Sequence, residues 1–133
     1  MSVVFADTFY FLGLTNPGDQ VHAKCVSFAR QHRGEFLTTS AVLLEYANAA
    51  SKPPYRGRAA AFLESLSADQ RVKIVPLTAA LFDRGRALYE QHADKEWSLT
   101  DCISFVTMRD ERIVEAATGD HHFEQAGFTA LLK

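Results

Sequence analysis

The run Val3-Val4-Phe5-Ala6-Asp7 decides the fold, because it is a short apolar strand that ends at a carboxylate. Similar runs of strand length recur along the chain, at residues 35–38, 72–75, 113–117 and 128–132. Helical patterns separate them, over residues 22–30, 40–50, 58–66, 78–92, 98–108 and a short segment from Gly119-Asp120 to Gly127. Strands that alternate with helices indicate an α/β fold, in which a parallel sheet is covered on both faces.

Two of the predicted helices have recognisable caps and inward faces. Ser40 and Thr78 are each predicted to cap the helix that follows. The periodicity places Leu43, Ala47 and Ala50 on the inward face of the first of these helices. The residues predicted on the inward face of the second are Leu81, Gly85, Leu88 and Tyr89. Both helices are expected to pack against the rest of the fold through these faces.

Length and composition exclude several classes of protein. The chain has 133 residues, the size of one domain, and its 47% hydrophobic content excludes a disordered chain. Its net charge of −2 lacks the positive excess of a basic nucleic-acid clamp. The longest stretch without Asp, Glu, Lys or Arg runs only from Thr8 to Gly18, too short to span a membrane. The N-terminus lacks the pattern of a secretory signal, and Cys25 and Cys102 form no zinc motif or disulfide framework, so a reducing cytoplasm fits best.

Four carboxylates are predicted at the same edge of the sheet. Asp7 and Asp120 directly follow strands, Glu45 lies in the second turn of the helix after the second strand, and Asp101 lies in the first turn of the helix from Ser98. Ligands of open parallel sheets bind outside the carboxyl ends of the strands. Carboxylates brought together repel one another unless they are protonated or held by a cation. Mg²⁺ or Mn²⁺ suits such oxygen ligands and catalyses phosphodiester hydrolysis, so metal-assisted cleavage of a nucleic acid is expected.

Each of these acids also has an ordinary structural role open to it. Asp7 can end a strand in an Asx turn, and Glu45 can be a solvated helix residue. Asp101 can form a capping box with Ser98, and Asp120 can cap its short helix. The hypothesis of a metal site therefore depends on the conjunction of the four.

Several neighbouring residues are candidates to support the site. Hydroxyl groups lie near the acids and can orient the carboxylates, although caps and turns are the simpler interpretation of Thr8, Ser40, Ser98 and Thr118. His121 and His122 follow Asp120 and can contact phosphate, or can form an exposed helix start. Cys102 is expected in the core rather than as a nucleophile, because a reactive thiol needs an activating base.

One basic segment and one tryptophan complete the candidates. The segment 52–58 gathers positive charge around an aromatic ring, and its members can contact RNA or an acidic partner or can simply form a solvated turn: Lys52, Tyr55, Arg56 and Arg58. Trp97 can line the rim of the site or pack against the sheet.

Read together, four segments resemble the PIN domain, and more closely the VapC-type toxin ribonucleases of toxin–antitoxin pairs. The segments are residues 3–8, 39–45, 97–105 and 117–123, of which Ser98-Leu-Thr-Asp-Cys-Ile-Ser-Phe105 and Thr118-Gly-Asp-His-His-Phe123 are the most specific. The resemblance covers nearly the whole chain and implies one PIN-like domain over residues 1–133. Its fold would be an α/β/α sandwich with a five-stranded parallel sheet.

The same resemblance implies an activity and partners. Asp7, Glu45, Asp101 and Asp120 match the acidic positions of the family and would hold Mg²⁺ or Mn²⁺, and Thr118 matches a supporting hydroxyl. The activity would be endoribonucleolytic, on structured RNA such as tRNA or rRNA. The partners implied are a second copy of the chain, in a homodimer, and a VapB-like antitoxin that inserts a segment into the acidic pocket.

Other functions are compatible with a doubly wound fold. A housekeeping RNA-processing nuclease of the PIN class and a non-catalytic PIN-like interaction domain are the alternatives. A signalling receiver domain is disfavoured because the third strand ends in Val75-Pro76 without a phosphoacceptor Asp. A glycosidase-like carboxylate pair is disfavoured because the sequence lacks an aromatic sugar platform.

Overall fold

The fold is built on a parallel sheet, described by a computed structural model that covers residues 2–133. The five strands of the sheet are β1 (Val4–Ala6), β2 (Phe36–Thr39), β3 (Val72–Val75), β4 (Glu115–Ala117) and β5 (Thr129–Ala130). They lie in the order β3-β2-β1-β4-β5, and every neighbouring pair is parallel. The predicted five-stranded parallel sheet is therefore confirmed, and each strand is found inside or within one residue of its predicted segment.

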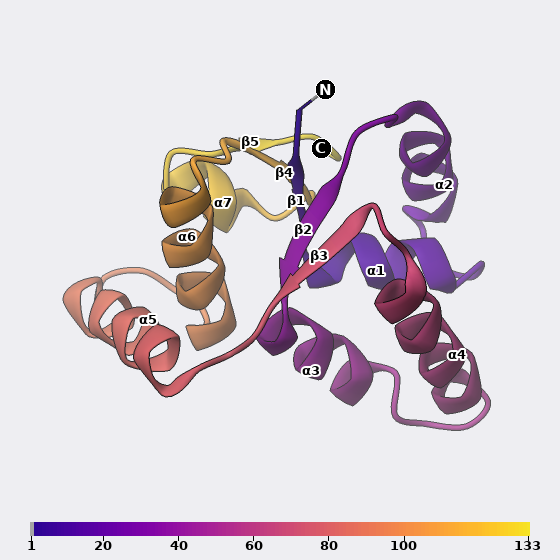
Figure 1. The fold of residues 1–133 in the computed structure, drawn as a ribbon, viewed down its shortest axis with the longest axis horizontal. Coiled ribbons are helices and arrows are strands. Elements are labelled where there is room, and N and C mark those ends of the chain that lie inside the picture. The colour runs from indigo at the N-terminus through magenta and orange to yellow at the C-terminus, as the bar shows by residue number, and fades with distance from the viewer. Residues whose placement is uncertain (1) are drawn as a thin grey trace.

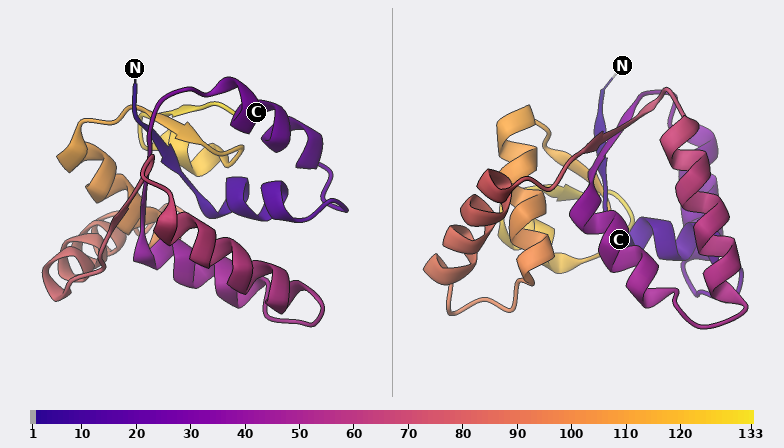
Figure 2. Two further views of the ribbon diagram at one scale, coloured as in Figure 1. Left: turned by 45° about the vertical axis from the view of Figure 1, so that its right-hand side comes forward. Right: turned by 60° about the horizontal axis from the view of Figure 1, so that its bottom comes forward.

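Helices cover both faces of this sheet. They are α1 (Thr8–Thr15), α2 (His22–Gln31), α3 (Ser40–Ala49), α4 (Tyr55–Ala68), α5 (Ala79–Gln91), α6 (Leu99–Glu111) and α7 (His121–Gln125). Figure 1 shows α1, α2 and α4 on one side of the sheet and α6 and α7 on the other, with α5 packed outside α6. The two turned views in Figure 2 agree with this arrangement. The predicted α/β/α sandwich is therefore confirmed. None of the helices in residues 2–133 is long and apolar enough to cross a membrane.

Helix α1 is the one long element that the periodicity did not predict. Its sequence, Thr8-Phe-Tyr-Phe-Leu-Gly-Leu-Thr15, is apolar almost all round and presents no polar stripe. It packs against α2, α3 and α4, and Tyr10 and Phe11 are buried. A helix enclosed on several sides needs no polar face, so its pattern carries no period of 3.6 residues.

Helix α3 differs from its prediction in both cap and face. Thr39 caps it by accepting a hydrogen bond from the amide of Val42 (3.1 Å). The hydroxyl of Ser40 instead accepts a hydrogen bond from the amide of Leu77 (2.7 Å), which ties the start of α3 to the chain before α5. The fully buried side chains of α3 are Ala41, Val42 and Tyr46, whereas the predicted Leu43, Ala47 and Ala50 are only partly buried, with Leu43 and Ala50 packed against the core. Helix α3 contacts both α1 and α4, and these contacts decide which of its faces is buried. Sequence periodicity does not show which other helices a helix will contact.

Helix α5 follows its prediction except at one residue. Thr78 caps it by accepting a hydrogen bond from the amide of Leu81, and Leu81, Gly85 and Leu88 are buried. Tyr89 was predicted inward, but it is 50% exposed. The outer helix of a layered fold packs through a narrower stripe than a central one, and Tyr89 lies at the edge of that stripe.

Buried aromatic rings connect the sheet to α6 and α7. Phe105 of α6 packs edge-on against both Trp97 (5.1 Å between ring centroids) and Phe123 of α7 (5.0 Å). Phe123 in turn lies 6.3 Å from Phe5 in β1. Trp97 is only 6% exposed, and its indole N–H donates a hydrogen bond to Gln125 (2.9 Å). Trp97 is therefore a packing residue, and these contacts fix the first turns of α6 and α7 relative to β1.

Gly85 sets the approach of α5 to α6. A Cβ atom at this position would lie 2.4 Å from the Cγ1 atom of Ile103 and 3.2 Å from its Cα atom. Gly85→Ala is therefore expected to lower the free energy of unfolding by about 2 kcal/mol, as overpacked cores do. The matched control is Gly57→Ala in α4, where a Cβ would meet nothing within 4 Å. Because alanine favours helices, this control should raise stability by up to about 1 kcal/mol. Urea denaturation measures both, and equal stabilisation by the two variants would contradict the packing assigned to Gly85.

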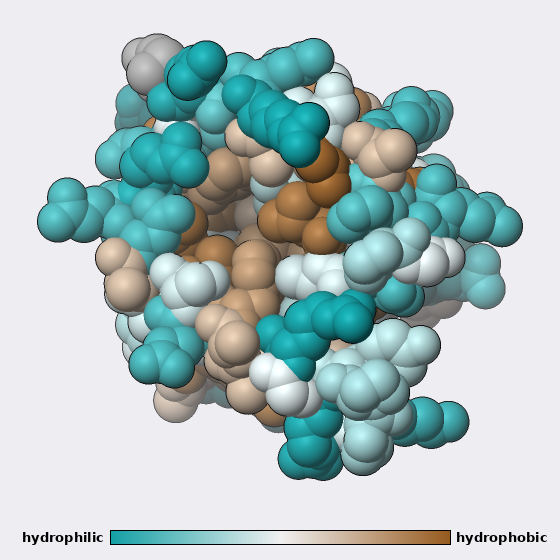
Figure 3. Space-filling model, turned by 90° about the vertical axis from the view of Figure 1, so that its right-hand side faces the viewer, coloured by the Kyte–Doolittle hydropathy of each residue, from teal (hydrophilic) through white to brown (hydrophobic). Residues whose placement is uncertain are grey.

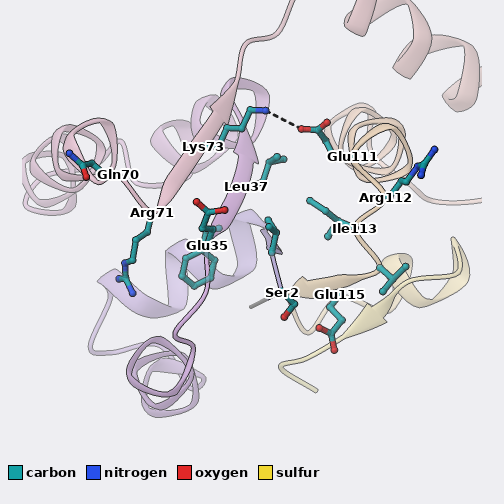
Figure 4. A pocket seen from close by; sticks show the side chains of 13 residues that line it. Ser2, Glu35, Leu37, Gln70, Arg71, Lys73, Glu111, Arg112, Ile113 and Glu115 are labelled. Atoms are coloured by element: carbon teal, nitrogen blue, oxygen red, sulfur yellow. Dashed lines mark hydrogen bonds and ion pairs between the residues drawn. The ribbon is translucent and has the colours of Figure 1, made fainter.

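The two ends of the sheet differ in character. A pocket of about 490 Å³ lies at the amino ends of the strands, lined by residues that precede or begin β1 to β4 and by the end of α6 (Figure 4). An ion pair between Lys73 and Glu111 (3.2 Å) crosses it. The predicted acids all belong to the opposite end.

The face that carries α2 and α4 is also hollowed. Figure 3 shows hydrophobic side chains gathered inside the hollow and hydrophilic ones around its rim. Within this side of the molecule, a pocket of about 250 Å³ lies between α1, α3 and α4, lined by residues that include Leu12, Tyr46 and Ala59.

Candidate active site

The acidic residues meet at the carboxyl end of the sheet because of strand order. β1 and β4 are direct neighbours, with Ala6 opposite Ala117, so the residues that follow them emerge side by side. Asp7 directly follows β1, and Asp120 follows β4 after two residues. Glu45 approaches from α3, which follows β2, and Asp101 approaches from the first turn of α6. The topology thus delivers carboxylates from distant parts of the sequence to one place.

Asp7 and Asp120 are joined by the hydroxyl of Thr118. The hydroxyl donates a hydrogen bond to Oδ2 of Asp7 (2.8 Å) and accepts one from the amide of Asp120 (3.1 Å). Asp7 is only 4% exposed and Thr118 is fully buried. Thr118, a predicted supporting residue, therefore fixes the position of a buried carboxylate.

Glu45 is held by Thr8. The Thr8 hydroxyl donates to Oε1 of Glu45 at 2.5 Å and lies 3.5 Å from the carbonyl of Val42. Glu45 is half-buried rather than fully solvated. Because Thr8 directly follows Asp7, this bond connects α3 to the strand end that carries the buried aspartate.

Asp101 caps helix α6, and its carboxylate also contacts a residue at the start of α7. It forms a capping box with Ser98, in which the Asp101 amide donates to Oγ of Ser98 (3.0 Å) and the Ser98 amide donates to Oδ2 of Asp101 (3.1 Å). The same Oδ2 atom also lies 3.1 Å from Nδ1 of His122. Capping α6 therefore positions this carboxylate beside α7.

Asp120 likewise caps a helix and faces a neighbour. Its Oδ1 atom accepts a hydrogen bond from the amide of His122 (2.9 Å) and lies 3.3 Å from Nδ1 of the same residue. Potential metal ligands of Asp120, His121 and His122 lie within 4.8 Å of one another.

The electrostatics show that the acids act on one another. The pKa of Asp7 is raised to about 7, chiefly by burial and further by the charges of Asp101 and Glu45, while the hydrogen bond from Thr118 opposes the shift. The pKa of Asp101 is raised by burial and by the charge of Asp120, and it is lowered by hydrogen bonds from Ser98 and His122. Ionised carboxylates this close in a buried setting are costly without a compensating positive charge.

Hydrogen bonds leave part of each carboxylate available. The side-chain bonds of residues 2–133 reach Oδ2 of Asp7 and of Asp101, Oδ1 of Asp120 and Oε1 of Glu45. The second oxygen of Glu45, Asp101 and Asp120 accepts none of these bonds, and the backbone amide of Thr8 also acts on the Asp7 carboxylate. The carboxylate oxygens of buried Asp7 and Asp101 and of half-buried Glu45 and Asp120 are the hard, anionic donors that a divalent cation prefers, so the residues fit Mg²⁺ or Mn²⁺.

Cys102 does not contribute a nucleophile. It is fully buried, and burial together with the charge of Asp101 raises the pKa of its thiol to about 11. A thiol with such a pKa stays protonated near neutral pH and is inert.

The basic segment spans the turn after α3 and the first turn of α4, so the solvated turn considered for it describes Lys52, whereas Tyr55, Arg56 and Arg58 are helical. Arg56 Nε donates to the carbonyl of Ser51 (2.9 Å), and Arg58 Nη1 donates to the carbonyl of Thr15 (3.2 Å). The guanidinium of Arg58 lies 6.0 Å from the ring centroid of Tyr55, and Lys52 is exposed. Neither arginine bonds to the four acids: the Arg56 bond supports the turn after α3, and the Arg58 bond ties the start of α4 to the end of α1.

His122 is the site residue whose role sequence reasoning did not identify. Its side chain is 18% exposed and contacts two of the acids, whereas that of His121 is 67% exposed. The prediction that both histidines are exposed at the start of the helix therefore holds only for His121. The signal was local, because the side chain of a capping Asp accepts a hydrogen bond from the backbone amide two residues on, which holds that residue beside the Asp.

The chain is similar to known proteins both in sequence and in fold. Residues 4–129 match the PIN domain. Two relatives from strains of Mycobacterium tuberculosis, both named 23S rRNA-specific endonuclease VapC20, are 30% identical over 127 residues, which make up 95% of this chain and of each relative. The crystal structure of M. tuberculosis VapC20, described as a sarcin–ricin loop cleaving toxin, covers 99% of this chain and 100% of its own with a TM-score of 0.90 at 25% identity. FitAcB from Neisseria gonorrhoeae shares the fold, with a TM-score of 0.65 at 16% identity over 97% of this chain and 96% of its own.

Proposed function

Since this chain belongs to the PIN-domain family, we propose that it is a metal-dependent endoribonuclease of the VapC type, the toxin of a VapBC-type toxin–antitoxin pair. The observation that carries the proposal is the convergence of Asp7, Glu45, Asp101 and Asp120 on the carboxyl end of the sheet, where hydrogen bonds hold one oxygen of each acid. One nuclease domain, residues 1–133, would contain the whole site.

The four acids would hold Mg²⁺ or Mn²⁺. When bound, such an ion lowers the pKa of water and stabilises the leaving oxygen of the cleaved phosphodiester. The protein supplies the fixed ligands: Thr118 holds Asp7, Thr8 holds Glu45, and the capping box with Ser98 holds Asp101. Preorganised ligands leave little reorganisation for the reaction itself.

Thr118→Val tests this support. Valine keeps the shape of threonine but removes both hydroxyl bonds, to Asp7 and from Asp120. Cleavage and metal affinity are expected to fall by about 10–100-fold, the usual effect of losing a bond that orients a metal ligand. Thr107→Val is the control, because its buried hydroxyl bonds only to the carbonyl of Ile103 on the same helix. Equal rates in the wild type and Thr118→Val, measured on one RNA under one metal concentration, would contradict the role of Thr118.

The proposed substrate is ribosomal RNA. The VapC20 relatives are named for 23S rRNA, and the similarity to them extends over nearly the whole chain. The exposed cations of the segment 52–58 would guide the phosphate backbone, because the net charge of −2 supplies no general attraction. Purified protein with Mg²⁺ should cut 23S rRNA in intact ribosomes at one mapped site. Cleavage confined to tRNA would overturn this choice of substrate while leaving the ribonuclease assignment standing.

The toxin role is separable from a housekeeping one. Induced expression of the chain should arrest growth, and co-expression of the small reading frame next to its gene should restore it. Such a toxin would act in the cytoplasm, where ribosomes are found. Growth unaffected by active enzyme would favour the housekeeping alternative, and a protein without cleavage under any metal would favour the non-catalytic one.

Two surfaces support the proposed partners. An antitoxin segment that enters the acidic pocket would place further apolar side chains in the apolar pocket between α1, α3 and α4, which is rimmed by Tyr55 and Arg58. Exposed Leu44 (58%) and Phe82 (38%) flank a groove of about 350 Å³ between α3, α5 and α6 that also has Glu45 in its lining, and a second copy of the chain would cover these two apolar side chains beside the acidic site. Leu44→Asp with Phe82→Asp should convert a dimer to a monomer in light scattering. A wild-type protein that is monomeric at the same concentration would contradict the homodimer.

A further inference from the structure

We infer that His122 is a positioning residue that locks Asp101 to Asp120 and so sets the distance between two ligands of the proposed cation; this inference rests on the proposed function. The imidazole Nδ1 atom lies 3.1 Å from Oδ2 of Asp101 and 3.3 Å from Oδ1 of Asp120. One ring nitrogen thus faces carboxylates from two different helices, α6 and α7.

The chemistry of these contacts defines what His122 does. Both atoms that face Nδ1 are carboxylate oxygens, which only accept hydrogen bonds when ionised, so Nδ1 carries a proton and donates it. A donor aimed at a metal ligand orients that ligand rather than binding the metal. His122 therefore uses Nδ1 to hold the carboxylates, and Nδ1 is not itself a ligand.

The position of His122 is itself fixed from both sides. Its amide donates to Oδ1 of Asp120 (2.9 Å), which anchors the backbone to the acid that the side chain also faces. The next residue, Phe123, is fully buried against Phe5 and Phe105. The imidazole therefore has little freedom, and its side chain is only 18% exposed.

The oxygens that the His122 ring contacts are those that backbone amides already hold, the amide of Ser98 on Asp101 and the amide of His122 itself on Asp120. Oδ2 of Asp101 also accepts the Ser98 amide, so His122 and Ser98 share one oxygen and leave Oδ1 free. On Asp120, the His122 amide and ring both face Oδ1 and leave Oδ2 free. His122 thus restrains one oxygen of each acid and does not contact the other, and Asp101 is also close enough to Asp7 for their charges to interact.

His121 provides a matched control one residue away. Its Nδ1 atom lies 3.7 Å from Oδ1 of Asp120, beyond hydrogen-bond distance, and its side chain is 67% exposed. Loss of His121 removes a histidine from the same helix start without removing the bridge between Asp101 and Asp120.

The test measures Mn²⁺ binding by titration calorimetry, independently of RNA cleavage, in four variants. Asparagine places an amide N–H where Nδ1 lies, and glutamine places one where Nε2 lies. His122→Ala and His122→Gln are expected to weaken Mn²⁺ binding by about 10–100-fold, whereas His122→Asn and His121→Ala should stay within about threefold of the wild type. Thermal unfolding in EDTA checks that each variant folds, and the Asn–Gln comparison decides the question should His122→Ala fail to fold.

The outcomes separate this inference from the proposed function. Wild-type affinity in both His122→Ala and His122→Gln would overturn the inference alone. Retention of binding by Gln with loss by Asn would overturn it in favour of a direct Nε2 ligand, and an equal loss in His121→Ala would do so in favour of a histidine pair that binds the metal. A wild-type protein that binds no Mn²⁺ would overturn the proposed function, and the positioning role with it.

Discussion

Replacing Asp7 with asparagine is expected to reduce RNA cleavage by at least about 10³-fold, which corresponds to roughly 4 kcal/mol of lost transition-state stabilisation. Asparagine keeps the shape of Asp7 and still accepts the hydrogen bond from Thr118, so the variant should fold. It removes the negative charge that interacts with those of Asp101 and Glu45 and would bind the cation.

Two further variants on helix α6, one inside the proposed site and one outside it, show whether the loss of cleavage is specific to the site. Asp101→Asn should cause a loss of similar size, because its Oδ1 atom is available to the same cation. Asp110→Asn on the same helix removes an exposed carboxylate that pairs with Arg84, far along the helix from the site, and should leave cleavage within about twofold of the wild type, as exposed ion pairs matter little. Initial rates on one RNA at saturating Mg²⁺ measure all three. Full activity in both Asp7→Asn and Asp101→Asn would defeat the assignment of the site.

The second large effect concerns stability without metal. The pKa of Asp7 is about 7 in the folded protein against 3.8 ordinarily, so between these values the folded state binds more protons than the unfolded state. The free energy of unfolding then falls as pH rises through this window. Above the folded pKa, the whole stabilising contribution of the protonated Asp7 carboxyl is lost. The shift of about three pKa units corresponds to at most roughly 4 kcal/mol.

Asp7→Asn should remove most of that dependence. In EDTA, urea denaturation should show the wild type losing stability from pH 5 to pH 8, and the variant should be about 2–4 kcal/mol more stable than the wild type at pH 8. Mg²⁺ at 100 times its dissociation constant should return about 2.7 kcal/mol to the wild type and almost nothing to the variant. The same pH slope in both proteins would show that Asp7 does not carry the buried charge.

These two effects have opposite signs for one substitution. The carboxylate that the proposed reaction needs is the carboxylate that destabilises the metal-free fold. Sites built for function commonly cost stability in this way. Loss of cleavage together with a gain in stability cannot come from simple misfolding of Asp7→Asn.

Much of this architecture could be predicted from the sequence, for a physical reason. Short apolar runs such as Val3–Ala6 end abruptly at polar residues, and their alternation with helices leaves a parallel sheet as the natural arrangement. Once the sheet is parallel, Asp7 and Asp120 must leave it at the same edge. Thr118 lies directly after β4, so its contact with Asp7 follows from the pairing of β1 with β4.

What could not be predicted depends on tertiary neighbours. Helix α1 has no polar face because several helices surround it, and α3 buries Tyr46 more fully than Leu43 because α1 and α4 both contact it. The hydroxyl of Ser40 bonds to Leu77, a residue 37 positions away, instead of capping its own helix. His122 contacts Asp101 across 21 residues, and only the packing of α7 on α6 brings them together.

The central claim is that carboxylates from four segments hold one divalent cation site, and an anomalous-scattering map from a Mn²⁺-soaked crystal tests it most directly. We predict an anomalous peak among the carboxylates of Asp7, Asp101 and Asp120 that is absent from an Asp7→Asn crystal soaked in the same way. A map without a peak there, or with a peak only at the exposed ring of His121, would contradict the claim.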